Sequence, residues 1–311
     1  MKLLSLCLNP SVDRTMDCPS FDVRSTNRVH FVRDDIGGKG INTAVLASRL
    51  GAESILSLPA PEDDRERLSA FLRRERVAFS AVPVPGRLRV NLKIRTENDM
   101  VEINEEGAPV PPQAAEACAS ALEDAAAPGV FCLLTGSLPP GVPDDCYARL
   151  IPRMRGKGCL SAVDADGGVL KAALKEKPDL IKPNLQEFSR LTGLQPRGIG
   201  ECCLFSRRLI TRTGVGAVCL SLGGDGAVYV TKSEALYAPA LQVSVRSLHG
   251  AGDSLLSALC LSLSRGDDAR AALALGCAAA AAAVSLPGTE MPSQEDVEAL
   301  LPRVRIENVD I

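Results

Sequence analysis

The chain has 311 residues and a formal charge of −3, from 35 basic and 38 acidic side chains. Because there is no basic surplus, we expect neither nucleic acid nor an anionic membrane surface as its main partner. Hydrophobic residues make up 46% of the sequence, which is enough to bury a sizeable core, so we expect a soluble globular protein. No repeat or linker divides it, which favours a single domain over residues 1–311.

The cysteines argue against a metal site or a disulfide framework. Eleven are scattered without Cys-x-x-Cys spacing, and the chain has only two histidines, which disfavours zinc. Their number is odd, several lie in apolar runs, and no signal peptide precedes them, so we expect reduced thiols in a cytoplasmic protein. The longest apolar stretch, residues 269–286, is rich in alanine and contains Arg270, and we interpret it as a packed helix rather than a membrane span.

The first apolar run, residues 1–8, predicts a buried strand whose carboxyl end opens into a loop at Asn9-Pro10. Asp13 follows in that loop. Ligands of open α/β sheets bind beyond the carboxyl ends of the strands, so Asp13 is a candidate for binding substrate hydroxyls. A turn-stabilising role is the alternative.

Two stretches, at about 12–35 and 87–106, mix polar and apolar residues in a way that is typical of exposed strands. The second alternates with period two, which places on one face Arg87, Arg89, Asn91, Lys93 and Arg95. A solvated strand would alternate too, but the cationic excess favours an anionic ligand. We expect these strands to form a small β-sheet lid, and a second subunit could cover its apolar face in a homodimer.

A glycine-rich turn at residues 36–42 opens a helix that runs to Leu50 and stops at Gly51. Its glycines, with Lys39 and Asn42, are typical of a site where the amides at a helix start bind an anion. The Walker A and Gly-x-Gly-x-x-Gly patterns are both absent, and a purely structural turn is the alternative.

A similar turn at residues 247–254 leads into an apolar helix. Its glycines let the backbone approach an anion closely, and the unpaired amides at a helix start bind phosphate. Asp253 lies in the same first turn, where the helix dipole keeps it ionised, so it could accept a proton from a neighbouring hydroxyl. A loop closed by Asp253 or Ser254 as a helix cap is the alternative.

After residue 104 the pattern alternates between helices, expected at 111–127 and 143–155, and strands, expected at 130–134, 159–163 and 180–181. Polar loops follow these strands, as in a parallel sheet with its site along one edge. Residues 217–230 predict strand, glycine turn and strand, and such a turn lets a nucleotide lie close to the backbone.

Asn184 and Glu187 stand three residues apart at the start of a predicted helix, which indicates a capping box. The alternative is that both, together with Asp164, hold water around a magnesium ion. Magnesium is a hard cation that prefers oxygen ligands and keeps much of its hydration.

Taken in order, these motifs make the sequence similar to the PfkB carbohydrate kinases of the ribokinase-like fold, in the branch that contains 1-phosphofructokinase and tagatose-6-phosphate kinase. The resemblance spans nearly the whole chain, and seven motifs carry it: residues 8–13, 37–42, 89–93, 136–139, 182–187, 221–226 and 250–253. It implies a three-layer α/β/α architecture with a mostly parallel central sheet and a small β-sheet lid.

The resemblance also implies roles for single residues. Asp253 would be the base, and the charge developing on the phosphoryl group would be held by the amides of Gly250, Ala251 and Gly252. Sugar hydroxyls would be bound by Asp13, Gly38 and Asn42, and the sugar's phosphate by Lys39, Arg89, Asn91 and Lys93, with Ser137 also on the substrate side. The nucleotide would be bound by Lys182, Asn184, Ser221, Gly223 and Gly226, and magnesium, through water, by Asn184, Glu187 and Asp164.

The activity that the resemblance implies is phosphorylation of a ketohexose monophosphate by ATP with Mg²⁺, foremost fructose 1-phosphate to fructose 1,6-bisphosphate. Tagatose-6-phosphate kinase is one alternative, and a sugar-phosphate-binding regulator without catalysis is another. The sequence departs from the family at residues 56–65, which replace a glycine-rich segment, at Leu248-His249 and at Ala258. We interpret His249 as a packing or nucleotide-contacting residue.

Overall fold

The structure, a computed structural model, describes residues 1–97 and 99–311. A ten-stranded sheet lies at its centre. The strands are β1 (Lys2–Leu6), β4 (Glu53–Pro61), β5 (Ala78–Val84), β8 (Phe131–Thr135), β9 (Leu160–Asp164), β10 (Leu180–Ile181), β11 (Ala217–Ser221), β12 (Ala227–Val230), β13 (Ala235–Ala238) and β14 (Glu307–Asn308).

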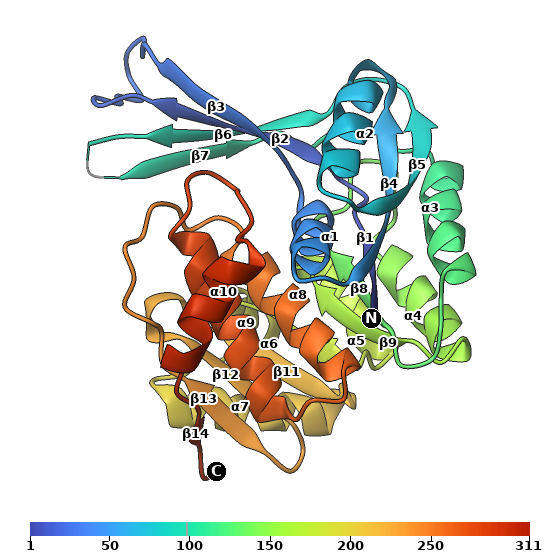
Figure 1. Cartoon of the computed structure of the whole chain (residues 1–311), viewed down its shortest axis with the longest axis vertical. Helices are drawn as coiled ribbons and strands as arrows, with labels where there is room; N and C mark the ends of the chain where they lie inside the picture. Colours follow the sequence, from blue (N-terminus) through green and yellow to red (C-terminus); the bar gives the residue numbers. More distant parts are fainter. Residues whose placement is uncertain (98) are drawn as a thin grey trace.

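The order across this sheet is β14-β13-β12-β11-β10-β9-β8-β1-β4-β5 (Figure 1). Neighbouring strands from β5 through β11 are parallel. The last three, β12 to β14, extend the sheet in antiparallel fashion. The carboxyl ends of the parallel strands therefore meet at one edge, where the polar loops of the sequence come together.

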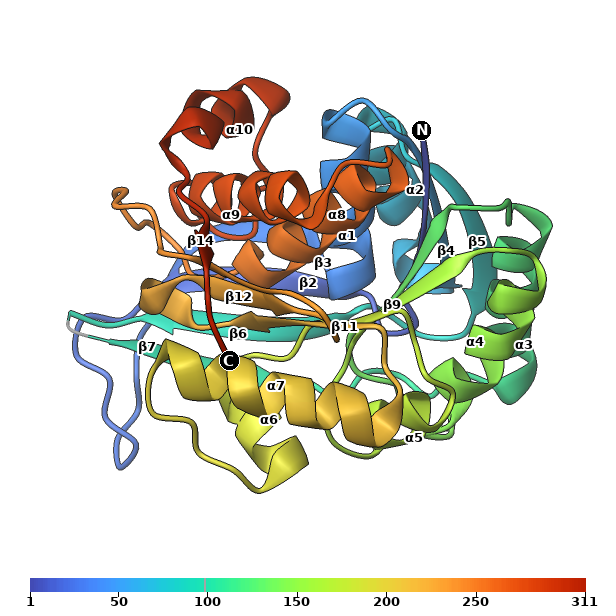
Figure 2. The same ribbon diagram turned by 90° about the horizontal axis from the view of Figure 1, so that it is seen from below.

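Helices cover both faces of the central sheet, as Figure 2 shows. One face carries α3 (Pro112–Asp124), α4 (Cys146–Gly156), α5 (Gly167–Lys175), α6 (Leu185–Thr192) and α7 (Ile199–Thr213). The other carries α1 (Lys39–Arg49), α2 (Arg65–Arg74), α8 (Ala251–Ser264), α9 (Ala269–Val284) and α10 (Gln294–Leu300). Short 3-10 turns are η1 (Glu62–Asp64), η2 (Gly223–Asp225) and η3 (Leu301–Arg303). The predicted three-layer α/β/α class is confirmed.

A separate four-stranded sheet, which we call the lid, projects from the carboxyl edge of the central sheet (Figure 1). It consists of β2 (Ser11–Asp17), β3 (His30–Gly37), β6 (Arg89–Arg95) and β7 (Met100–Asn104), in the order β3-β2-β6-β7. Asp13 lies inside β2 rather than in a loop, because residues 11–17 pair with both β3 and β6. The parallel register of β2 and β6 places Asp13 directly beside Asn91.

Small residues let α9 pack closely against α8. A Cβ on Gly276 of α9 would lie 2.9 Å from the carbonyl oxygen of Leu255 in α8. On its other side, α8 is tied to α1 because the Ser257 hydroxyl donates to the Thr43 carbonyl at 2.7 Å. Ala258 is fully buried among these helices. The alanine-rich stretch is therefore a packed helix, as predicted, and it fixes the start of α8 against α1.

Element ends differ from the prediction in places. The helix expected from residue 143 begins at Cys146, because residues 143–145 form a turn in which the Cys146 amide donates to the Pro143 carbonyl at 3.0 Å. Residues 56–61, where the family resemblance leads one to expect glycines, belong to strand β4 and are mostly buried. Within the two described ranges, no helix has the length and apolar character needed to cross a membrane.

Candidate active site

The two glycine-rich turns face each other at the start of α8 and α1. Asp253 lies in the first turn of α8 and is 7% exposed. The Asn42 amide, from the first turn of α1, donates to Asp253 Oδ2 at 2.7 Å. Burial raises the pKa of Asp253 above its ordinary value, although the attraction of Lys39 opposes this shift. A carboxylate with a raised pKa is a stronger base, so the geometry suits proton abstraction.

The start of α8 offers unpaired amides beside this base. Gly250 caps the helix in the left-handed conformation, with φ of 77°, which glycine adopts at little cost. The first bond of the helix runs from the Ser254 amide to the Gly250 carbonyl, so the amides of Ala251, Gly252 and Asp253 precede it. A Cβ on Gly252 would lie 3.1 Å from the Lys182 ammonium. Helix amides and a lysine therefore converge on one anion site.

Asp164, at the end of β9, is held between two lysines. Lys39 Nζ lies 2.7 Å from one of its oxygens and Lys182 Nζ lies 3.0 Å from the other. Burial acts to raise the pKa of Asp164, but attraction to Lys182 and Lys39 outweighs it and the pKa is lowered. The pKa of Lys39 is raised despite its burial, by Asp164 and then Asp253. Lys39 thus carries its charge between the base and Asp164.

The lid presents a buried polar cluster centred on Asp13. Asp13 accepts hydrogen bonds from Asn91 at 2.8 Å, Lys93 at 2.9 Å and Ser11 at 3.0 Å. The pKa of Asp13 is lowered, because these partners, Lys93 first, outweigh the effect of burial. Lys93 is therefore committed to Asp13 and does not offer its full charge to a phosphate, which differs from the expectation.

The other basic side chains expected on this face separate into two kinds. Arg87 pairs with Glu105 at 2.9 Å and Arg95 with Asp17 at 2.7 Å, and both pairs are exposed. Arg89 is partly buried, and its guanidinium donates to the carbonyls of Asn9 and Glu105. Of the four basic residues, only Arg89 combines a place on the cavity wall with no carboxylate partner among the described residues. It is the best placed to meet an anionic substrate.

These groups share one cavity of about 670 Å³ between the lid and the carboxyl edge of the sheet. Every predicted site residue except Ser137 lines it. Ser137 lines an adjoining cavity of about 800 Å³, which shares with the first the four residues Lys39, Arg89, Asn91 and Asn104. The sequence interpretation missed Glu102 and Asn104 of the lid and, in the segment after β13, Pro239, Ala240, Leu241, Val243 and Val245. No motif marks them, because residue spacing alone does not show which loops fold over the cavity.

Asn184 and Glu187 form the capping box of α6. The Glu187 amide donates to Asn184 Oδ1 and the Asn184 amide donates to Glu187 Oε2, both at 2.9 Å. The capping box uses Glu187 Oε2, Oε1 has no hydrogen-bond partner among the described residues, and Glu187 lines the cavity. No group of three or more His, Cys, Asp or Glu side chains in the described ranges has metal-binding geometry. A single carboxylate fits a magnesium ion held mainly by phosphate and water.

The far end of the cavity combines a glycine turn with an apolar wall. A Cβ on Gly226, where φ is 99°, would lie 2.0 Å from the Ala238 carbonyl oxygen, so only glycine fits between the strands β12 and β13. Gly223, Leu241, Val243, Ala280 and Val284 line the same end. An apolar slot beside exposed turn amides suits a flat aromatic base with polar edges.

Of the unusual pair Leu248-His249 before the anion site, the histidine contacts the lid. Leu248 is 75% exposed on the cavity rim, and His249 Nε2 lies 2.9 Å from Glu102 Oε1 on β7. The expectation of a packing or nucleotide-contacting histidine did not include this partner. The lid residue is 147 positions away in the sequence, and no local pattern joins the two.

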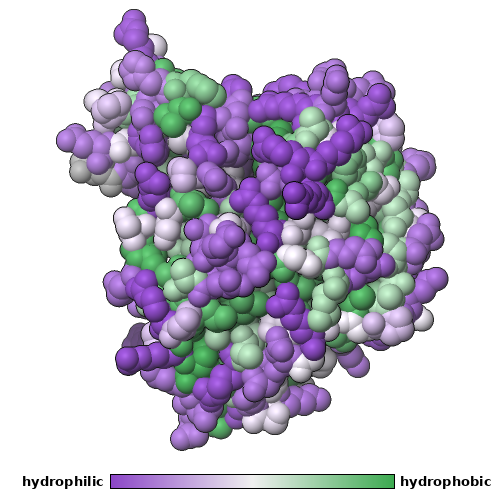
Figure 3. Space-filling model, viewed as in Figure 1, coloured by the Kyte–Doolittle hydropathy of each residue, from purple (hydrophilic) through white to green (hydrophobic). Residues whose placement is uncertain are grey.

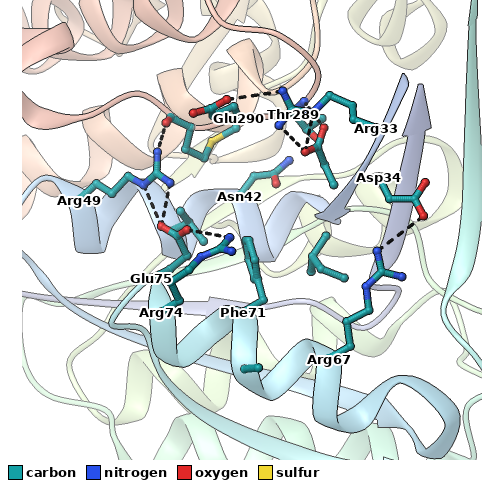
Figure 4. A pocket seen from close by; sticks show the side chains of 15 residues that line it. Arg33, Asp34, Asn42, Arg49, Arg67, Phe71, Arg74, Glu75, Thr289 and Glu290 are labelled. Carbon is teal, nitrogen blue, oxygen red and sulfur yellow. Dashed lines mark hydrogen bonds and ion pairs between the residues drawn. The ribbon is translucent and has the colours of Figure 1, made fainter. Parts of the chain in front are cut away.

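A separate cavity of about 530 Å³ lies where β3 meets α1, α2 and residues 289–291 (Figure 4). Its walls carry equal numbers of arginines and carboxylates: Arg33, Arg49, Arg67, Arg74, Asp34, Asp35, Glu75 and Glu290. They pair with one another, as Arg33 does with its strand neighbour Asp35 at 2.7 Å and Arg49 with Glu75 at 2.8 Å. Because its charges are matched, this cavity fastens the lid to the helices and offers little to a charged ligand.

A buried base beside free helix amides is the arrangement that lets a hydroxyl group attack a phosphate, and a glycine turn with an apolar slot faces it across the cavity. The class is therefore a phosphotransferase with an alcohol acceptor. The chain belongs to the pfkB family of carbohydrate kinases, whose model matches residues 7–296. The predicted family is confirmed, and ATP is the phosphoryl donor that a kinase of this family implies.

Relatives of known name extend over the whole chain. The 1-phosphofructokinase of Rhodobacter capsulatus is 30% identical, covering 99% of this chain and 98% of that protein. The ATP-dependent 6-phosphofructokinase isozyme 2 of Mycobacterium tuberculosis is 29% identical, covering 96% of this chain and 88% of that protein. The phosphofructokinase-2 of Escherichia coli, solved with substrates and products, has a TM-score of 0.90 at 26% identity, covering 97% and 99%. A tetrameric inhibited form of that protein has a TM-score of 0.87.

Proposed function

We propose that the chain transfers the γ-phosphoryl group of ATP to the C6 hydroxyl of fructose 1-phosphate, giving fructose 1,6-bisphosphate. The observation that carries the proposal is the place of Asp253, at the start of α8 between the polar lid face and the glycine turn. Similarity to 1-phosphofructokinases over the full length supports the choice of acceptor.

The acceptor would lie on the lid side of the cavity. Asp13, whose carboxylate is held ionised, would accept bonds from sugar hydroxyls, together with Asn42 and the backbone at Gly38. Arg89, with Asn91 and Ser137, would bind the phosphate already on the sugar, at the junction of the two cavities. A guanidinium without a carboxylate partner is suited to bidentate phosphate binding.

The transfer itself needs one base and fixed positive charge. Asp253 would take the proton of the C6 hydroxyl as the oxygen–phosphorus bond forms in line with the leaving ADP oxygen. The amides of Gly250, Ala251 and Gly252, at the start of α8, would hold the negative charge on the equatorial oxygens. Lys39 and Lys182 lie beside this site and would add attraction for the phosphates.

The nucleotide would lie along the opposite wall, near Lys182, Asn184, Ser221, Gly223 and Gly226. Magnesium would be held through water by Glu187 and Asn184, with Asp164 nearby. When bound, it would neutralise phosphate charge and orient the ATP. Because both oxygens of Asp164 already face lysines, Glu187 is the stronger candidate of the two carboxylates.

An ADP-release assay with four acceptors tests the substrate: fructose 1-phosphate, tagatose 6-phosphate, fructose 6-phosphate and unphosphorylated fructose. The highest kcat/KM is expected for fructose 1-phosphate. Preference for fructose 6-phosphate would assign the chain to the activity in the name of the Mycobacterium tuberculosis relative. Binding of a sugar phosphate with no ADP release would favour a non-catalytic regulator.

The lid supports a homodimer. Apolar residues with large exposure lie on β3 and on the connection between β2 and β3, among them Phe31 at 63% and Val23 at 86%. Figure 3 shows apolar side chains among polar ones on the projecting lid. We propose one kinase domain over residues 1–311, in which the lid strands extend from the central sheet and form the dimer contact. We also propose that the protein is cytoplasmic, since its eleven cysteines are free thiols. Light scattering is expected to give the molar mass of a dimer for the wild type and a lower average molar mass for Phe31→Ser, because the dimer contact is weakened. A monomeric wild type would contradict the proposal.

A further inference from the structure

Polar contacts fasten the lid to the core at both of its edges. At the β3 edge, the Thr289 amide donates to Asp35 at 3.2 Å, and Arg33 lies 3.6 Å from Glu290. At the β7 edge, Glu102 Oε1 lies 2.9 Å from His249 Nε2. The β3 edge is next to the chain connection into α1, whereas the β7 edge is the one farthest from it.

The His249 ring is oriented before it meets the lid. The hydroxyl of Ser247, which is buried, lies 3.2 Å from His249 Nδ1 and accepts the His249 backbone amide at 3.2 Å. The His249 side chain is 16% exposed, compared with 49% for Glu102. A ring that is fixed from one side and largely buried loses little further freedom when its other nitrogen binds a carboxylate.

The contact lies on the wall of the main cavity and joins the lid to the core. On the lid, Glu102 stands opposite Lys93 in the register of β7 and β6, and Lys93 supports Asp13. On the core, His249 immediately precedes Gly250, the cap of α8. Glu102 and His249 both line the cavity. One hydrogen bond thus joins the strand next to the sugar site to the turn that would hold the phosphoryl charge.

We propose that Glu102 and His249 form a latch that keeps the lid closed over the substrates during phosphoryl transfer. Both are positioning residues, and the inference rests on the proposed kinase function. Closure excludes water, which would otherwise compete with the sugar hydroxyl for the phosphoryl group of ATP. The latch therefore acts on two quantities: the efficiency with the sugar phosphate and the share of ATP that is lost to hydrolysis.

The charges at the latch are consistent with a donor on the histidine side. The pKa of Glu102 is lowered by the hydrogen bond to His249, and attraction to His249 and Lys93 adds to this effect, while partial burial and, less strongly, Asp13 oppose it. An ionised Glu102 can only accept, so Nε2 carries the proton. A hydrogen bond to a carboxylate is stronger than one between neutral groups.

A double-mutant cycle tests the latch with His249→Ala, Glu102→Ala and the double variant. Each single variant is expected to lower kcat/KM for fructose 1-phosphate about fivefold, equivalent to about 1 kcal/mol. ADP release per fructose bisphosphate formed is expected to rise above one. The double variant is expected to be no worse than either single variant, because each change already opens the latch. Glu97→Gln, which removes an exposed lid carboxylate outside the cavity, is the control and should stay within about twofold of wild type.

Glu102→Gln keeps an acceptor oxygen and should recover about half of the loss seen with Glu102→Ala. Additive losses in the double variant, unchanged kcat/KM in His249→Ala, or a loss with one ADP per product would each overturn the latch. Melting temperatures within a few degrees of wild type show that the variants are folded.

Hydrogen exchange separates a failure of the latch from a failure of the proposed function. In the wild type, fructose 1-phosphate is expected to slow exchange in the peptide that contains β7, and His249→Ala should abolish that protection. This measurement needs no turnover. An inactive wild type that shows the protection would overturn the kinase proposal and leave lid closure supported, whereas equal protection in His249→Ala would overturn the latch.

Discussion

Lys93→Met is the sharpest test of how the lid is built. It removes the ammonium that lies 2.9 Å from Asp13 and leaves the rest of the strand unchanged. Both side chains are almost fully buried, at 5% and 8% exposure, so the carboxylate that remains after the substitution stays largely desolvated. Methionine has a similar length and fills the same space without a charge.

The unfolding free energy lost in Lys93→Met depends on the partners that remain around Asp13. Breaking a buried ion pair by removing one partner typically costs about 3–5 kcal/mol, since the other charge stays desolvated. Asp13 keeps hydrogen bonds from Asn91 and Ser11, which places the expected loss near the lower end, at about 3 kcal/mol. Urea unfolding at neutral pH measures it globally, and hydrogen exchange in β2 and β6 measures it locally if the lid opens first.

The loss of unfolding free energy in Lys93→Met should become smaller as the pH is lowered. In the wild type the pKa of Asp13 is lowered, so the pair contributes stability above the ordinary aspartate pKa, and this contribution is lost as pH falls through the lower native value. In Lys93→Met the pKa of Asp13 rises, because burial is no longer opposed by the ammonium. The gap in unfolding free energy between wild type and variant should therefore narrow as the pH is lowered.

Asp13→Asn combined with Lys93→Met is the matched control, because it removes both charges and should recover most of the stability. A loss below about 1 kcal/mol at neutral pH would refute the reasoning. So would a gap that keeps the same size from neutral to acidic pH.

Three further outcomes follow from the site and the helices. Asp253→Asn should lower kcat by a factor of about 10²–10⁴, while the affinity for ATP, measured by calorimetry, should stay nearly unchanged. Normal turnover in this variant would exclude Asp253 as the base. Because burial raises the pKa of Asp253, kcat/KM should fall with acidification at a pH above the ordinary aspartate value, and a flat profile through that range would contradict this. Gly276→Val should lower the free energy of unfolding in urea by about 1–3 kcal/mol, because the new Cβ would meet the Leu255 carbonyl. Gly200→Ala, a position with open space around it, should not lower it, and equal effects of the two substitutions would contradict the packing argument.

The sequence predicts the architecture because its signals are local. Apolar runs, glycine turns and strand-end loops each depend on a few neighbouring residues, and a parallel sheet brings such loops to one edge. The assignment of Asn42 and Asp253 to one site comes from the family resemblance that these local motifs carry together, since each motif alone also fits a structural turn. The capping box of Asn184 and Glu187 is also local, and the structure shows both of its hydrogen bonds.

The pairing of charges was not predictable in the same way. Alternation along β6 marks Lys93 as polar, but its commitment to Asp13 depends on the register between strands about 80 positions apart. The two lysines on Asp164 and the contact between Glu102 and His249 likewise join distant segments. Local patterns indicate which side chains are polar and share one face of a strand, whereas only the assembled fold shows which of their charges are already paired.

A single residue, Gly38, separates the last residue of β3 from the first residue of α1, and its φ of 114° is open chiefly to glycine. A strand that ends one residue before a helix begins cannot tilt without acting on that helix. Movement of the lid at β3 is therefore expected to reach the first turn of α1, which carries Asn42. Because the Asn42 amide donates to Asp253 at 2.7 Å, a tilt of the lid is expected to act on the base as well as on the sugar side of the cavity.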